Sequence, residues 1–537
     1  MLRSPFPHLL HTNIVPTDAE CDSIRHLLDT ARQELAVLTR DLSLRSPFGG
    51  MHVPQQWGIE SDFSAQDAAL RISSSEDTLF KRHELEEFIN QHLSLVSLGR
   101  RIPEDVLREI FMATLTFDEN AMLGPYEPAI LSQTCRYWRD ITLTMPRLWA
   151  IIHIVVPSPL KLPHLFDAVR NWLERSGNDG PLDISLRFSP QSDDSCDLDP
   201  LMASITFLSR RWRHINLNLT SYTRLRSMTA EDVPLLESLV IKEHDHDLRY
   251  RDHYTEHLKI AEAKTLRRLE LPPFRTPKNP ENFTSLTYLN LSDRLGYLPY
   301  DGAISVLSHC LLLESCGLSV TGSSRFTPKH ISLPRLAHLS IFHLHIPQDA
   351  QFLTAASMSL PVLRAFHCDA LGRVLPNTTV RCLFPAADLA CLKIGLRPLT
   401  SDTLVAGLTT LPSLEELHVL NEPRGAERRG FPDPQFLHRL MPLCPRLRCL
   451  ELSQFTAISD TTILEFLRAR TKLQPHFLPL SYFASTIARP RQFDILLHLA
   501  DEVLDGLVVN IMYYSPYRSV PIARLKCSFE GMKMPSQ

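Results

Sequence analysis

The sequence predicts an α/β protein in which a helical N-terminal part is followed by a long series of strands that form a parallel sheet. Apolar residues recur at helical spacing over much of the first 150 residues, and a strand-like pattern of leucines recurs nine times beyond residue 230. The chain has 40 prolines but 18 glycines, which suits short elements joined by proline-marked turns and disfavours glycine-rich cofactor folds. At 537 residues the chain exceeds one compact core, so several domains or a repeat array are expected.

The first predicted part is an amphipathic helical segment over residues 17–97, preceded by an N-terminal tail over residues 1–16. Residues from about 45 to 77 show no apolar period and carry turn signals such as Pro47, so we expect a mobile insert there. The prediction is a helical hairpin with a long loop; alternatively, the insert is a gene-model artefact that interrupts one continuous helix. The apolar residues at helical spacing are Ile24, Leu27, Leu28, Ala31, Leu35, Leu38 and Leu42, then Leu79, Leu85, Phe88, Ile89 and Leu93.

Residues 98–150 form the next predicted domain, which contains three short helices. Pro103, followed by the acidic residues Glu104 and Asp105, is a typical helix start. One apolar face of this first helix consists of Val106, Leu107, Ile110, Phe111 and Leu115. Two further short helices, ending before Pro146, are indicated by Ile130, Leu131, Cys135, Trp138 and Ile141. An apolar segment that follows Leu148 and Trp149 then predicts a strand.

The motif pieces of this domain occur in a definite order. They are Ile102-Pro103-Glu104, Ile110-Phe111, Leu131-Ser132, Cys135-Arg136-Tyr137-Trp138-Arg139 and Pro146-x-Leu148-Trp149. This order resembles an F-box, and more closely the F-box-like domains of a large fungal (basidiomycete-type) family in which a helical segment precedes the box. The resemblance covers about residues 78–155 and extends more weakly back to Thr17. Ile102 replaces the usual leucine, and the loop between Phe111 and Ile130 is longer than in the shortest F-boxes.

The resemblance implies that residues 98–150 dock on the small adaptor subunit of a cullin-based, SCF-type ubiquitin ligase. Three short helices bury little surface alone, and tryptophan is common at interface centres, so the residues are compatible with docking. The alternative for Leu107, Ile110, Leu131 and Trp138 is that each fills the core of its own domain, whereas Pro103 at the exposed helix start favours a partner. The implied adaptor-binding residues are Ile102, Pro103, Glu104, Leu107, Ile110, Phe111, Leu131, Cys135, Trp138 and Trp149.

Residues 151–515 are predicted to be a repeat array, followed by a C-terminal tail over residues 516–537. The repeated unit is a leucine, two residues, a leucine, one residue and a leucine, which resembles the core of a divergent leucine-rich-repeat solenoid with a parallel sheet. Degenerate members are expected at 182–188 and 211–219, and a last strand at 505–514. Several unrelated α/β domains, the alternative, would not give nine strands of one form. The middle positions are 239, 269, 289, 316, 339, 366, 392, 417 and 450.

A search for catalytic and cofactor motifs finds no nucleotide, zinc-protease or hydrolase signature, so no cofactor is expected. Within residues 242–257, His253 and His257 are spaced to share a helix face and a metal, although a solvated loop is the stronger interpretation. Cys310, Cys316 and Cys391 are interpreted as core thiols. The eleven cysteines include no CxxC pair, which favours a reducing compartment, and we expect a soluble cytoplasmic or nuclear protein.

These observations predict a non-catalytic subunit that binds the ligase adaptor through residues 98–150 and an unidentified protein substrate through the repeats. The net charge of −4 gives no case for nucleic acid or a membrane surface as a partner. Two alternatives stay open at this point. One is an interaction scaffold without a ligase role, and the other is a metal-dependent enzyme that uses the loop from His244 to His257.

Overall fold

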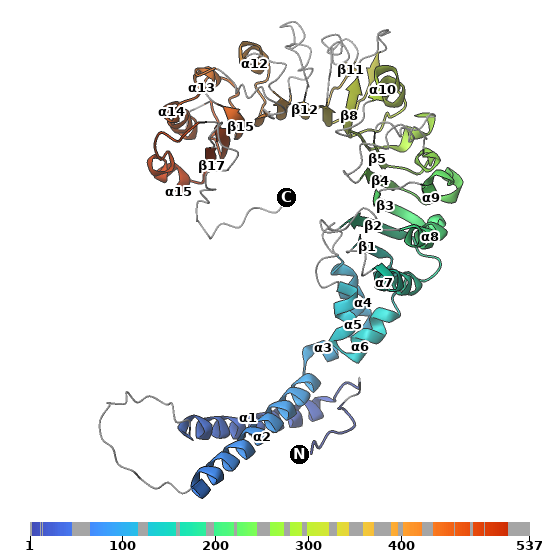
Figure 1. Cartoon of the computed structure of the whole chain (residues 1–537), viewed down its shortest axis with the longest axis vertical. Coiled ribbons are helices and arrows are strands. Elements are labelled where there is room, and N and C mark those ends of the chain that lie inside the picture. The colour runs from blue at the N-terminus through green and yellow to red at the C-terminus, as the bar shows by residue number, and fades with distance from the viewer. Residues whose placement is uncertain are drawn as a thin grey trace. The chain divides into compact units, whose positions relative to one another are not determined.

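Two units make up the chain, one mainly helical and one rich in strands (Figure 1). The helical unit comprises residues 1–151 and 171–180, and the strand-rich unit comprises residues 152–170 and 181–537. The computed structural model describes residues 3–10, 12, 14–45, 65–115, 127–156, 162–188, 198–219, 223–243, 258–272, 280–292, 298–321, 330–342, 358–369, 388–395, 401–420, 433–455, 457–472, 476–487 and 489–513.

The helical unit begins with the predicted hairpin. Its two long helices pack through a buried apolar cluster, in which Ile24 and Leu28 of the first helix meet Leu85 and Ile89 of the second. Each pair is one helical turn apart, so each helix presents one apolar stripe to the other. The helices of this unit are α1 (Asp18–Arg45), α2 (Ala65–Leu95), α3 (Leu98–Arg101), α4 (Glu104–Ala113), α5 (Glu127–Thr134), α6 (Arg136–Leu143) and the short 3₁₀ helix η2 (Pro146–Trp149).

Part of the expected insert is helical, which corrects the sequence prediction. Helix α2 starts at Ala65, so residues 65–77 belong to the second helix of the hairpin instead of forming a loop. Alanine and leucine in the stretch "AQDAAL" favour helix, and a helix already stabilised further along extends at low cost. Residues 46–64 of the insert, and with them the possible gene-model artefact, lie outside the described residues.

The strand-rich unit confirms the predicted α/β class with a long parallel sheet. Its main sheet has fifteen strands in the part of the chain that the structure describes, and their order follows the sequence. Along this order lie β1 (Ile151–Val156), β2 (Leu182–Phe188), β3 (Trp212–Leu219), β4 (Ser238–Glu243), β5 (Arg268–Glu270), β6 (Tyr288–Leu291), β8 (Ser315–Thr321), β10 (His338–Phe342), β12 (Ala365–Asp369), β13 (Cys391–Gly395), β14 (Glu416–Leu420), β15 (Cys449–Phe455), β16 (Tyr482–Ile487) and β17 (Val508–Tyr513). The two-residue β7 (Leu298–Pro299) pairs with β8, while β9 (Ile331–Ser332) and β11 (Met358–Ser359) form a separate pair.

The nine predicted strands pair in register through their middle apolar residues. Each of these residues is the Cα partner of the next along the sheet, and all are buried. Because successive strand residues point to opposite faces, the residues between them form the other face. The buried ladder consists of Leu239, Leu269, Leu289, Cys316, Leu339, Phe366, Leu392, Leu417 and Leu450.

A repeated hydrogen-bond pattern joins the start of one strand to the residue that precedes the neighbouring strand. The carbonyl oxygen of Glu314 accepts the N–H groups of Ala337 and His338, at 2.9 and 3.1 Å. The carbonyl oxygen of Ala337 accepts in turn from Arg364 and Ala365, at 2.9 Å each. The same arrangement recurs at the entry to β15. One carbonyl therefore starts each new strand, which keeps successive strands in one register.

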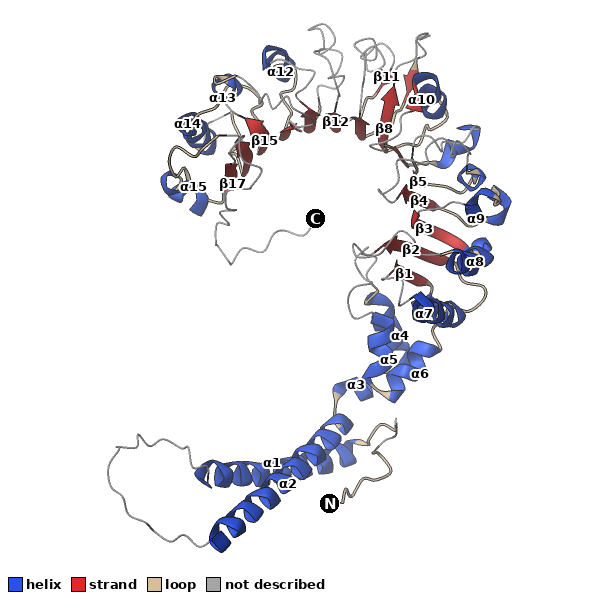
Figure 2. Ribbon diagram, in the orientation of Figure 1, coloured by secondary structure: helices blue, strands red, loops and turns tan. Residues whose placement is uncertain are grey.

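The described helices of this unit lie on one side of the sheet (Figure 2). We call the opposite side the open face; Tyr288 and Asn290 of β6 belong to it. Among the helices of the described residues, none is both long and apolar enough to cross a membrane. The helices connecting the strands include α7 (Leu162–Arg175), α8 (Asp199–Phe207), α9 (Thr223–Arg226), α10 (Tyr300–Leu307), α12 (Ser401–Leu408), α13 (Phe436–Leu440), α14 (Asp460–Thr471) and α15 (Ala500–Leu504), with 3₁₀ helices η4 (Ser209–Arg211), η5 (Ala230–Asp232), η7 (Lys259–Glu262), η9 (Pro280–Ser285) and η11 (Leu496–His498).

Candidate functional site

The predicted adaptor-binding residues lie in and around the small core of a unit built by α4, α5, α6 and η2, which we call the helical module. Leu107 and Phe111 lie one turn apart on α4 and are completely buried. Leu131 comes to them from α5, and Ile141 from α6. The module thus closes its core with one apolar stripe from each helix, as the amphipathic pattern requires. Four predicted site residues belong to this core: Leu107, Phe111, Leu131 and Trp149.

Trp149 is held on every side. Its indole nitrogen donates a hydrogen bond of 2.8 Å to the carbonyl oxygen of Thr142, and its side chain is 1% exposed. The ring of Trp172 meets its ring edge-on at a centroid distance of 4.8 Å, and the Arg175 guanidinium lies 4.7 Å from its centroid. A tryptophan enclosed in this way stabilises the module and offers no surface to a partner.

Trp138 and Cys135 have different surroundings. The Cys135 sulfur caps α6 by accepting the backbone N–H of Trp138 at 3.5 Å, and Cys135 is exposed. The Trp138 ring meets the Phe111 ring edge-on at 5.0 Å but remains half-buried. Arg139 donates to the carbonyl oxygen of Ser132 at 2.8 Å, which ties α6 to the end of α5. The motif residues of α6 therefore both fix the helix and leave part of Trp138 accessible.

The start of α4 is exposed, as the sequence predicts for Pro103. Pro103 is the residue before the helix, and Ile102 packs half-buried against the core of the module. Glu104 is exposed and accepts two hydrogen bonds from Arg108, at 2.6 and 2.9 Å. Arg108 also donates to the hydroxyl of Thr144 at 3.0 Å, which links α4 to the end of α6. Glu104 is thereby part of the bonding that holds the module together.

Ile110 and Val106 form an exposed apolar surface on α4. Val106 is not one of the predicted adaptor-binding residues. Val106 is 44% exposed and Ile110 is 41% exposed, one helical turn apart on the same side of the helix. Ile130 of α5 and Leu143 of α6 are also 41% exposed. Sequence patterns marked Val106 and Ile130 as apolar but did not separate them from core residues, because exposure depends on packing between helices.

The strand-rich unit has its own polar clusters. Asp183 of β2 is buried and accepts hydrogen bonds from Nε and Nη2 of Arg213, at 3.0 and 2.6 Å. Burial raises the pKa of Asp183, but hydrogen bonds from His214 and Arg213 outweigh this effect and hold the pKa below its ordinary value. On β6, the Tyr288 ring lies 3.8 Å below the guanidinium carbon of Arg268. Both clusters join neighbouring strands: Tyr288 is the register partner of Arg268, and Asp183 is the register partner of His214, next to an irregularity in the β2–β3 pairing.

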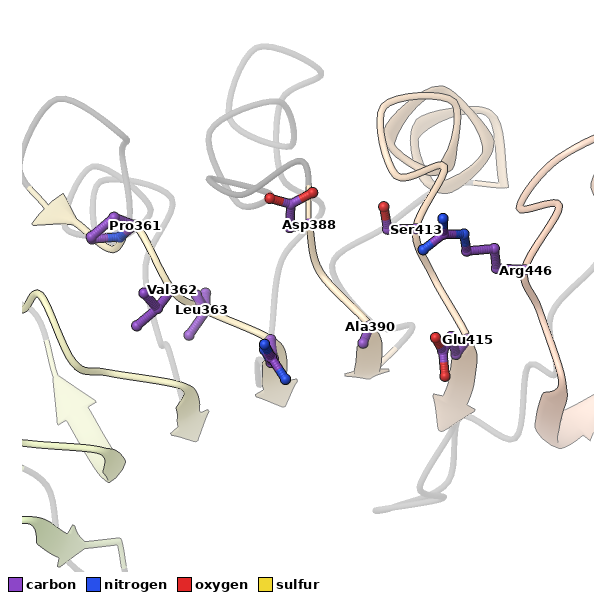
Figure 3. A pocket seen from close by; sticks show the side chains of 9 residues that line it. Pro361, Val362, Leu363, Asp388, Ala390, Ser413, Glu415 and Arg446 are labelled. Carbon is purple, nitrogen blue, oxygen red and sulfur yellow. The ribbon is translucent and has the colours of Figure 1, made fainter.

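A pocket lies where the chain enters β12, β13 and β14 (Figure 3). Asp388, Glu415 and Arg446 surround it, together with the further cation Arg364. Because two acidic and two basic side chains line it, the pocket has no charge preference for an anionic or a cationic ligand. We assign it no ligand.

Two of the three cysteines predicted to be core thiols are buried, and the third is not. Cys310 and Cys316 are buried, as expected of core thiols, and burial raises the pKa of Cys310 to about 12. Cys391 is not a core thiol: it is half-buried on the open face, because its neighbours Leu392 and Ile394 take the buried positions. The histidines from His244 to His257 lie outside the described residues.

Comparison with known proteins leaves the family unassigned. No protein-family model matches this chain, and no curated protein matches it. The functional conclusion therefore depends on the residues, contacts and exposures of the helical module and of the open face.

Proposed function

We propose that this chain is a substrate-recognition subunit of a cullin-based ubiquitin ligase. In this proposal the helical module is an F-box that docks on the adaptor subunit, and the strands belong to a divergent leucine-rich-repeat solenoid that binds a protein target. The five ordered motif pieces between Ile102 and Trp149 support the module, and the ladder of buried strand residues supports the solenoid.

The observation that carries the proposal is the apolar surface of α4. A helix of ten residues already buries Leu107 and Phe111, yet it also exposes Val106 and Ile110. Exposed apolar side chains grouped on a small domain are typical of a protein interface. Pro103 precedes this surface, and Trp138 contributes a half-buried ring to the module. Several of the residues that the F-box resemblance implies therefore remain accessible to an adaptor.

The open face supports the second half of the proposal. Its strands carry Tyr288 and Tyr482, and Arg268 lies over the first of these rings. Tyrosine and arginine are enriched among residues that dominate protein–protein binding energy. In this role the chain performs no bond chemistry, because holding a target close to the ligase raises its effective concentration at the transfer site.

Co-purification of the full chain with the adaptor tests the proposal. The intact chain is expected to form a stable complex, and the double variant Pro103→Ala/Trp138→Ala is expected to lose it. Because Trp138 contacts Phe111, the thermal stability of the variant is measured beside its binding. Absence of adaptor binding by the intact, folded chain would overturn the ligase role and leave the interaction scaffold in its place.

A further inference from the structure

Three potential metal ligands meet on the open face of the sheet. Cys391 of β13 and Glu416 of β14 are register partners, and His418 is two residues beyond Glu416 on the same strand. All three side chains therefore leave the sheet on one face. One ligand atom from each residue lies within 4.8 Å of the other two. All three residues lie on two adjacent, hydrogen-bonded strands of the main sheet, so the backbone holds the cluster rigidly.

We infer that Cys391, Glu416 and His418 form a binding site for a zinc ion. A thiolate, an imidazole and a carboxylate are all zinc ligands, and a soft thiolate disfavours magnesium and calcium. In a tetrahedral zinc site, neighbouring ligand atoms are about 3.3–3.6 Å apart, given the usual metal–ligand distances. The Nε2 atom of His418 already lies 3.6 Å from Oε2 of Glu416.

The orientation of His418 is a second, independent observation in favour of a metal. Its Nδ1 atom lies 2.8 Å from Oε2 of Glu451, the register partner on β15, which fits donation of the Nδ1 hydrogen to that carboxylate. This bond leaves the lone pair of Nε2, the ring nitrogen 3.6 Å from Oε2 of Glu416, available to a metal ion. Histidines that bind metals usually donate their other ring hydrogen to a carboxylate or carbonyl in this way. Glu451 would thus be a positioning residue for the ligand His418.

The charges around the cluster suit a divalent cation. Lys393, the register partner of His418 on β13, supplies one positive charge, while Glu416 and Glu451 supply two negative charges. Zinc binding releases the Cys391 thiol proton to solvent and leaves a thiolate. The thiolate and the two carboxylates then outweigh Lys393 by two negative charges, which one zinc ion neutralises. Three protein ligands leave the fourth position for water, on the open face.

The test uses the full chain, freed of metal with a chelator under reducing conditions and titrated with zinc chloride. Binding is measured by calorimetry, and cobalt(II) is substituted to reveal thiolate ligation through its charge-transfer absorption. The wild-type chain is expected to bind at this site with a thiolate-to-cobalt band. Cys391→Ser is expected to lose the band and to bind zinc at least tenfold more weakly, and Glu416→Gln to weaken binding as well.

Cys449→Ser is the matched control. Cys449 is the register partner of Glu416 on the other side and is also half-buried, but it is not one of the three clustered ligands. It is expected to leave both zinc affinity and the cobalt band unchanged. Glu451→Ala is expected to keep the band and to weaken zinc binding by about 10- to 100-fold, as loss of a carboxylate behind a ligating histidine does. A wild-type chain without a thiolate band, or a Cys391→Ser chain with an unchanged band, would overturn the inference.

Discussion

The helical module differs from the main sheet of the strand-rich unit, which we call the array, in where its apolar residues lie. In the array, each of the nine predicted strands buries its middle apolar residue and turns alternate residues to the open face, as Leu417 and His418 show on β14. In the module, α4 buries Leu107 but leaves its neighbour Ile110 41% exposed. The difference indicates where each part would bind a partner. The module would use the exposed apolar side chains of α4, and the array would use the polar side chains of its open face.

The largest expected effect concerns a core residue of the module. Trp149→Ala is expected to lower the free energy of unfolding of the helical unit by about 3–5 kcal/mol, because it removes a buried ring and the hydrogen bond from the indole to the Thr142 carbonyl. Denaturant titration followed by circular dichroism measures this change. Trp138→Ala serves as the comparison and should cost less, since that ring is half-buried; equal losses would contradict the distinction between the two tryptophans.

Truncation of a buried leucine in the array is expected to cause the next largest loss of stability. Leu417→Ala creates a cavity in the buried ladder and should lower the free energy of unfolding by about 2–5 kcal/mol. The same substitution at Leu504, which is 81% exposed on α15, should change it by less than about 0.5 kcal/mol. Chemical denaturation of both variants checks the pair. Similar losses at both positions would show that burial does not determine stability in the array.

The third effect concerns a buried charge near the end of the array. Asp460 at the start of α14 has a completely buried side chain that accepts hydrogen bonds from the guanidinium of Arg489, at 2.5 Å, and the backbone N–H of Gln492, at 2.7 Å. The Tyr513 hydroxyl donates a further bond of 3.0 Å from β17. Asp460→Asn removes the negative charge, so the free energy of unfolding should fall by about 1.5–3 kcal/mol at neutral pH.

The lowered pKa of Asp460 makes the free energy of unfolding depend on pH. Burial raises its pKa, but the bonds from Arg489 and Gln492 outweigh burial and hold the pKa below its ordinary value of 3.8. A lowered pKa means that this stabilisation is complete above about pH 4 and is lost as the pH falls through the lowered pKa. Unfolding measured between neutral and acid pH should therefore show a smaller acid loss in Asp460→Asn. If both chains lost the same stability at acid pH, other carboxylates would be responsible for that loss.

Sequence reasoning predicted much of the array because its signal is periodic. The spacing of leucines located nine strands and their buried positions, and the stretches 182–188 and 211–219 were also correctly identified as strands. The leucine spacing does not indicate strand β16, because Phe483 and Ser485 occupy the positions of the second and third leucines. Phe483 nevertheless lies in register with Leu450, so an aromatic side chain fills the same place in the ladder.

The candidate sites were less predictable, because they depend on packing between elements. Leu107 and Ile110 are both apolar and only three residues apart, yet one is buried and the other is exposed. The apolar surroundings of Cys391 favour a core position, whereas the alternation of Leu392 and Ile394 indicates the open face. Arg470 is 3% exposed and donates to the carbonyl oxygens of residues at least 23 positions away, which no local pattern indicates.

The most direct test of the central claim is the dissociation constant of the full chain and the ligase adaptor, measured with the double variant Val106→Ser/Ile110→Ser. Both side chains are exposed, so we expect the smallest effect on stability here, on the order of 0.5 kcal/mol. We expect the wild-type chain to bind the adaptor, and the double variant to bind at least tenfold more weakly while remaining folded. A folded wild-type chain that does not bind, or a variant that binds equally well, would contradict the claim.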